Sequence, residues 1–178
     1  MLNTVYQLVR PRQFEVVFKD ITMDDKHVIV HPTHLSICNA DQRYYQGLRA
    51  EAVLKKKLPM ALIHEGIGRV IYDPTGHFEQ GTLVVMIPNT PVEQDEIIAE
   101  NYLRSSKFRA SGFDGFMQEY VSMEPDRLVI LPEDINLSVA AFTEIVSVSY
   151  HAIQRFLRFS HERRNVIGVW GDGNLGYI

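Results

Sequence analysis

The chain has 178 residues, of which 46% are apolar and 22% are charged, with 18 basic and 22 acidic side chains. This composition excludes a disordered or fibrous chain, and a single cysteine excludes a disulfide scaffold. A net charge of −4 without a basic block predicts no nucleic-acid partner. No apolar stretch approaches the roughly 20 residues that cross a bilayer, so we expect no membrane association and a cytoplasmic location.

The first part of the chain, to about Pro132, is predicted to be mainly β. Its apolar runs are short and rich in β-branched residues, and turn residues interrupt them. This pattern predicts a small β-barrel or sandwich. The expected strands lie at 14–18, 28–30, 68–72, 83–87, 116–121 and 128–131.

A long helix is expected after residue 137. Ser138 can cap a stretch whose apolar residues continue for about five turns without glycine or proline, which predicts one helix, largely buried. Glu144 is the only acidic residue in this stretch, and no lysine or arginine lies three or four residues away from it. Its partner must therefore come from elsewhere in the fold, either as a metal ion or as a distant basic group.

The last residues combine a predicted strand with a glycine pattern. The apolar run 165–170 leads directly into Gly171, Gly173 and Gly176, which have the spacing G-x-G-x-x-G. After a strand, this pattern indicates a dinucleotide site, in which the glycines allow a tight turn and close approach of a pyrophosphate. The alternative is an ordinary glycine-rich turn. Because a domain does not normally end inside such a turn, we expect a longer protein.

Cys38, His64 and Glu65 are further candidates for chemistry. Cys38 lies between a predicted strand and a short helix, and His64-Glu65 precedes another strand. Taken singly, Cys38 could be a small buried hydrophobic residue and His64-Glu65 a solvent-facing loop. Together with Glu144, they form a thiolate, imidazole and carboxylate set that suits zinc. The other histidines show no ligand spacing.

Four motifs in order resemble those of the zinc-dependent medium-chain dehydrogenases. They are the cysteine loop 36–41, the His-Glu-Gly motif 64–68, the glutamate-bearing helix 143–152 and the nucleotide turn 171–176. The resemblance implies a GroES-like catalytic β-barrel domain at 1–137, a connecting helix at 138–162 and the start of a truncated, NADP-binding Rossmann domain at 163–178.

The same resemblance implies roles for individual residues. Cys38, His64 and Glu144 would bind a catalytic zinc ion, Glu65 would be a fourth ligand or exchange with water, and Asp41 would hydrogen-bond the histidine ligand. The nucleotide would contact Gly171, Gly173, Asn174, Leu175 and Gly176.

Two departures from that family carry consequences. The segment from Asn89 to Gly112 contains no cysteine, so we expect one zinc ion and no structural zinc. Ala40 stands where a hydroxyl residue often relays the proton. We therefore expect the proton to come from water, from a carboxylate such as Glu65 or Glu144, or from a tyrosine such as Tyr44.

Residues 5–15, 41–45, 85–91 and 170–178 are similar to a branch of the family that reduces ribulose 5-phosphate to ribitol 5-phosphate with NADPH. That branch serves the synthesis of poly(ribitol phosphate) teichoic acids and capsules beside a cytidylyltransferase. The likeness implies such an oxidoreductase, which we expect to form a homo-oligomer. Arg43, beside Tyr44, is the first candidate for the substrate phosphate, and Arg104, Lys107 and Arg109 follow.

Two other interpretations remain open at this stage. One is a zinc-dependent dehydrogenase of a free polyol or simple alcohol, and the other is a β module used for association, with vestigial metal groups. We also expect the 178 residues by themselves to fold but to lack reductase activity. A dinucleotide site needs the strands and helix that surround its glycine turn.

Overall fold

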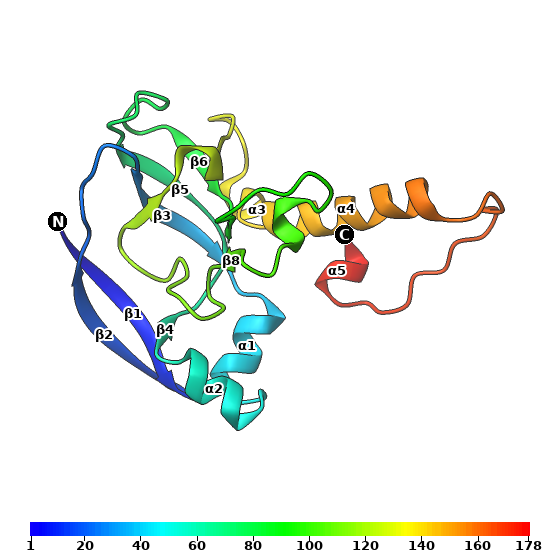
Figure 1. Ribbon diagram of the computed structural model, residues 1–178, viewed down its shortest axis with the longest axis horizontal. Coiled ribbons are helices and arrows are strands. Elements are labelled where there is room, and N and C mark those ends of the chain that lie inside the picture. The colour runs from blue at the N-terminus through cyan, green and yellow to red at the C-terminus, as the bar shows by residue number, and fades with distance from the viewer.

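Two antiparallel sheets form the body of the structure, a computed structural model that describes residues 1–178. The larger sheet has the strand order β10-β6-β5-β3-β9 and the smaller one β2-β1-β4, while β7 and β8 form a separate hairpin. Figure 1 shows both sheets on one side of the molecule, with helix α4 extending away from them. None of the helices combines the length and apolar character that a bilayer crossing demands.

The strands are β1 (Leu2–Arg10), β2 (Gln13–Asp20), β3 (Val28–Ser36), β4 (Met60–Ala61), β5 (Glu65–Tyr72), β6 (Leu83–Met86), β7 (Asn89–Thr90), β8 (Lys107–Phe108), β9 (Val121–Met123) and β10 (Leu128–Ile130). The helices are α1 (Asn39–Tyr45), α2 (Glu51–Lys57), α3 (Leu137–Ala140), α4 (Thr143–Phe159) and α5 (Asn174–Tyr177), with short 3-10 turns at Glu100–Tyr102 and Pro125–Arg127.

The core is built from the apolar runs that the sequence shows. Its largest cluster joins the strands of the larger sheet and is made of Val28, Val30, Val70, Val84, Met86, Phe116, Val121, Met123 and Leu128. A second cluster packs β1 and β4 against the helices α1 and α2 through Leu8, Tyr44, Met60, Leu62 and Ile63. Burial of these side chains stabilises the barrel and holds the loops at the end of β3 and the start of β5 next to each other.

Five of the six predicted strands overlap β2, β3, β5, β6 and β10. The sixth, 116–121, is wrong except for its last residue, because Phe116 and Met117 donate their N–H groups to the backbone of Ile63 and Leu62 and form no regular strand.

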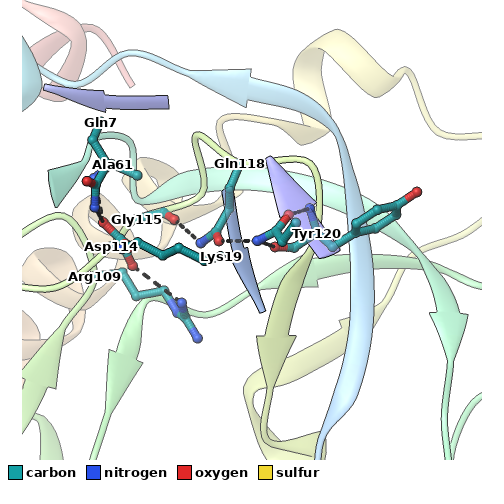
Figure 2. Close-up of polar contacts among 9 residues, drawn as sticks. Gln7, Lys19, Ala61, Arg109, Asp114, Gly115, Gln118 and Tyr120 are labelled. Carbon is teal, nitrogen blue, oxygen red and sulfur yellow. Dashed lines mark hydrogen bonds and ion pairs between the residues drawn. The ribbon is translucent and has the colours of Figure 1, made fainter. Parts of the chain in front are cut away.

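Strand β1 is missing from the predicted strands. Polar residues occupy two of its inward positions and hide the alternation of apolar and polar residues that indicates a strand. One of them is Asn3, whose side chain donates to Gln118 at 2.9 Å and accepts the N–H of Tyr120 at 2.9 Å (Figure 2). Each of these bonds satisfies a polar group that the barrel would otherwise bury unpaired.

The prediction of a single long, buried helix after residue 137 is also wrong. The segment divides into α3 and α4, and the cap is Asn136, whose side chain accepts the N–H of Val139, and not Ser138. Only Ile145 is buried in α4, since the helix meets β5 near its first turn and then leaves the barrel (Figure 1).

The predicted strand at 165–170 is not formed. A strand is stabilised by hydrogen bonds to a neighbouring strand, and this segment has none beside it. Val166 and Trp170 accordingly remain 91% and 90% exposed.

Asp114 joins three segments of the barrel through its carboxylate (Figure 2). One oxygen accepts the side-chain N–H of Gln7 at 2.9 Å and the backbone N–H of Ala61 at 2.7 Å, and the other pairs with the ammonium of Lys19. Burial by itself raises the pKa of the Asp114 carboxyl, but the hydrogen bonds from Lys19, Ala61 and Gln7 outweigh it and leave the pKa below its ordinary value.

We predict that this carboxylate makes the barrel sensitive to acid. A pKa lowered by folding contributes stability above the unfolded value of about 3.9, and that contribution is lost as the pH falls through the folded pKa. The difference in free energy of unfolding between the wild type and Asp114→Asn, measured by urea unfolding from pH 7 to pH 3, should therefore shrink below about pH 4. Asp134→Asn, at an exposed position without a side-chain hydrogen bond or ion pair, should show no such trend.

Gly115 supports the backbone next to the candidate site. A Cβ atom there would lie 2.2 Å from the carbonyl oxygen of Ile63 and 2.5 Å from that of Leu62, and both carbonyls are fixed because they accept the N–H groups of Phe116 and Met117. We predict that Gly115→Ala lowers the free energy of unfolding by about 3 kcal/mol, by analogy with overpacked cores. Gly173→Ala, where a Cβ would meet nothing within 4 Å, should change it by less than about 0.5 kcal/mol. Equal stabilities of the two variants would contradict this account.

Candidate metal centre

Cys38 is held at the start of α1 by its own capping contacts. It is the N-cap residue, and its Sγ accepts the N–H of Ala40 at 3.5 Å. The carboxylate of Asp41 in turn accepts the N–H of Cys38 at 3.1 Å, which completes a capping box. These bonds place the thiol at the point where β3 ends and the chain turns into a helix.

His64 and Glu65 are placed by an unusual backbone conformation just before them. Ile63 has a φ of 70°, a left-handed conformation that is rare for a β-branched residue. Its N–H donates to Asp41 Oδ1 at 2.9 Å, so the same buried carboxylate that caps α1 also holds the start of β5. The distance from Asp41 Oδ1 to His64 Nδ1 is 3.8 Å, longer than a hydrogen bond, so Asp41 orients the histidine mainly through the backbone.

Cys38, His64 and Glu65 converge. Their ligand atoms, the thiol sulfur, a ring nitrogen and a carboxylate oxygen, all lie within 4.8 Å of one another. His64 and Glu65 are only 7% and 1% exposed, and Glu65 Oε1 is buried without any hydrogen-bond partner. A buried carboxylate oxygen without a donor is costly unless a cation compensates it, and this donor set suits zinc. The residues present therefore fit the metal that the family resemblance implies.

Glu144, in the first turn of α4, lines the same cavity of ≈ 850 Å³ as these three residues, but its carboxylate does not belong to the converging group. Burial raises the pKa of Glu144 to about 7, and the nearby carboxylates of Glu65 and Asp41 contribute to the rise. Burial also raises the pKa of the Cys38 thiol. No lysine or arginine lines this cavity, and His64 is the one side chain in its lining that could carry a positive charge beside these acidic groups.

The glycine turn faces the same cavity. Gly171, Gly173, Asn174, Leu175 and Gly176 all line it, and α5 begins directly after Gly173. Gly171 has a φ of 110°, and a Cβ at Gly176 would lie 2.2 Å from the carbonyl oxygen of Gly171. Gly171 and Gly176 are therefore required by the turn itself, and the turn lines the same cavity as Cys38 and His64.

The residues predicted to hold a substrate phosphate lie elsewhere. Tyr44 is 5% exposed and belongs to the apolar core, which also removes it as a source of protons. Arg43 is exposed and donates to the carbonyl of Leu48 at 3.5 Å. Neither lines the cavity, because the helical period of α1 turns Asn39 and Gln42 toward it instead. The i, i+3 spacing places Asn39 and Gln42 on one face of α1, but Asp41 and Tyr44 share the same spacing, so only the packing of α1 decides which face meets the cavity.

Comparison with known proteins identifies the family. Residues 24–133 match the alcohol dehydrogenase GroES-like domain, and the chain belongs to this family. It is 63% identical over 178 residues to a ribulose-5-phosphate reductase of Bacillus spizizenii and 63% identical to ribulose-5-phosphate reductase 2 of Staphylococcus aureus, covering all of this chain and 52% of each relative. The crystal structure of S. aureus TarJ in complex with NADPH is 50% identical, with a TM-score of 0.79, over 99% of this chain and 48% of that one. The chain thus spans about half the length of the curated relatives it matches.

The metal assignment predicts a specific spectroscopic result. Cobalt(II), which substitutes for zinc, absorbs in the near ultraviolet when a thiolate binds it, so the intact protein should show this band and Cys38→Ser should lose it. His64→Ala should weaken the affinity about tenfold or more. Glu65→Gln should weaken it more than Glu144→Gln, because only Glu65 shares the 4.8 Å group.

The control is His77→Ala, at an exposed turn position that does not belong to the converging group. It should bind cobalt(II) as the wild type does. An unchanged near-ultraviolet band in Cys38→Ser would contradict the assignment.

Proposed function

We propose that the protein containing this chain reduces ribulose 5-phosphate to ribitol 5-phosphate with NADPH. The observation that carries the proposal is the combination of a converging cysteine, histidine and glutamate with 63% identity to ribulose-5-phosphate reductases over the whole chain. The NADPH complex of the S. aureus relative supports the choice of cofactor. We further propose that the product enters teichoic acid or capsule synthesis through a cytidylyltransferase and that the enzyme is a homo-oligomer.

In this proposal, Cys38, His64, Glu65 and Glu144 would hold zinc. When bound there, zinc supplies Lewis-acid polarisation of the substrate carbonyl. Asp41 keeps the two ligand segments in register through the N–H groups of Cys38 and Ile63.

The other groups of the cavity serve binding and proton transfer. The backbone of the glycine turn offers a close approach to the nucleotide in the cavity that the ligand side chains also line. Ile145 and Val148 add apolar side chains of α4 to the lining of the cavity. The carboxyl groups that line it are those of Glu65 and Glu144, and whichever of the two is released from the metal would move the proton that Ala40 cannot relay.

A neighbouring cavity suits the phosphate of the substrate. It has a volume of ≈ 380 Å³, shares Glu144 and Val148 with the metal cavity, and is also lined by Arg127 and His151. Arg127 is held in place by Glu100 at 3.0 Å and Asp126 at 2.7 Å. This arrangement brings the guanidinium of Arg127, with the carboxylates of Glu100 and Glu144 in the same lining, next to a metal cavity that has no lysine or arginine.

The second candidate is a zinc-dependent dehydrogenase of a free polyol or simple alcohol. The absence of lysine and arginine from the metal cavity favours it, because a phosphate normally requires charge-assisted contacts. The two candidates differ in how strongly the rate depends on the phosphate of the substrate.

The experiment compares kcat/KM for ribulose 5-phosphate and for ribulose in the intact, zinc-loaded protein with NADPH. We expect a preference of about 100-fold or more for the phosphorylated ketose, the value of two charge-assisted hydrogen bonds. Arg127→Gln should reduce this ratio about tenfold, and the ratio is insensitive to a simple loss of folded protein. Arg43→Gln, which is exposed and away from both cavities, should leave it unchanged. Equal kcat/KM values for the two ketoses would favour the second candidate, a dehydrogenase of a free polyol or simple alcohol.

A further inference from the structure

A positively charged cavity lies on the other side of Phe108 from the metal centre. Phe108 lines this cavity of ≈ 690 Å³, while its ring packs edge-on against His64 at 5.2 Å between ring centres. The cavity shares no residue with the metal cavity. Three cationic side chains line it, those of Lys57, Lys107 and Arg109, against the single carboxylate of Glu124.

Arg109 is a largely buried cation without an ion pair. Its guanidinium donates to the carbonyl of Ser122 at 2.6 Å and to that of Asp114 at 3.4 Å, and it lies 5.5 Å from the centre of the Phe113 ring. Its Nε–H is buried and has no acceptor. Backbone carbonyls satisfy hydrogen bonds but do not neutralise a charge, so the positive field of Arg109 extends into the cavity.

Lys57 and Lys107 add accessible donors. The ammonium of Lys57 donates to the carbonyl and to the hydroxyl of Ser111 at 2.8 and 2.7 Å, which leaves its third N–H unused. Neither lysine forms an ion pair, in contrast to Lys55, which pairs with Glu51 at 2.7 Å. On the neighbouring strand β7, the hydroxyl of Thr90 is buried without a partner.

We propose that this cavity binds a phosphate group, carried by inorganic phosphate or by an ester of a small metabolite. A phosphate carries a charge of about −1.5 to −2 and three strong acceptor oxygens, which matches an excess of cations with unused donors better than a carboxylate does. The size of the cavity is in the usual range for small-molecule sites. Thr90, Lys107 and Arg109 belong to one segment, 89–112, which contains no cysteine.

The test measures phosphate binding to the intact, chelator-treated protein by calorimetry, against sodium chloride at equal ionic strength. Saturable binding is expected. Lys57→Met combined with Lys107→Met should weaken it about tenfold or more. The control pair Lys55→Met and Lys56→Met makes the same change in net charge outside the cavity and should leave the affinity unchanged. Arg109 is left in place because it anchors the loop that forms the cavity.

Glycerol 3-phosphate, titrated in parallel, distinguishes the two sources of the phosphate. Tighter binding of the ester supports a metabolite, and tighter binding of inorganic phosphate supports the free anion. Three results would overturn the proposal. They are no saturable binding of either probe, an equal loss of phosphate affinity in both double-lysine variants, and a loss of phosphate affinity in His64→Ala that the lysine variants do not show. Since no cofactor or ketose is present, the outcome is independent of the reductase assay and of the proposed function.

Discussion

The buried carboxylate of Asp41 is the contact on which the candidate metal centre depends. One of its oxygens accepts the N–H of Cys38 and the other accepts the N–H of Ile63, so a single side chain joins the end of β3 to the start of β5. The second bond also stabilises the left-handed conformation of Ile63, which costs roughly 1–2 kcal/mol for an ordinary residue. Without that conformation, His64 and Glu65 would continue the direction of β4 and would not meet the thiol.

The metal centre gathers three acidic groups around one histidine. Cys38, Glu65 and Glu144 are brought together without a lysine or arginine in the cavity, and the pKa values of Cys38 and Glu144 are raised as a result of burial. Such an arrangement opposes folding unless a cation is present. The apolar side chains of the barrel core stabilise the fold enough for this arrangement of acidic groups to persist. A metal ion bound there would make the electrostatic contribution of these groups to folding favourable.

Charge is separated across the hairpin of β7 and β8. One side carries the acidic metal cavity, and the other carries the cavity of Lys57, Lys107 and Arg109, with Phe108 between them. An anion could therefore bind on the basic side without competing for the metal ligands.

The sequence by itself determined the elements whose pattern is local. The short β-branched runs predicted five strands, and two of the motifs named Cys38, His64 and Glu65, whose ligand atoms the structure brings together. The prediction of strands from the sequence failed where polar residues point inward, as in β1. It also failed where an apolar segment has no neighbouring strand, as at Val166 to Trp170.

Only the tertiary structure decided how those residues meet. Cys38 and His64 are 26 positions apart, and nothing in either motif states that one carboxylate bonds to both segments. The sequence also could not place Arg43 and Tyr44 away from the cavity, because the orientation of α1 is set by its packing on the core. Hydrophobic periodicity specifies which side chains are buried, whereas the distance between two loops depends on contacts among residues that are far apart in the chain.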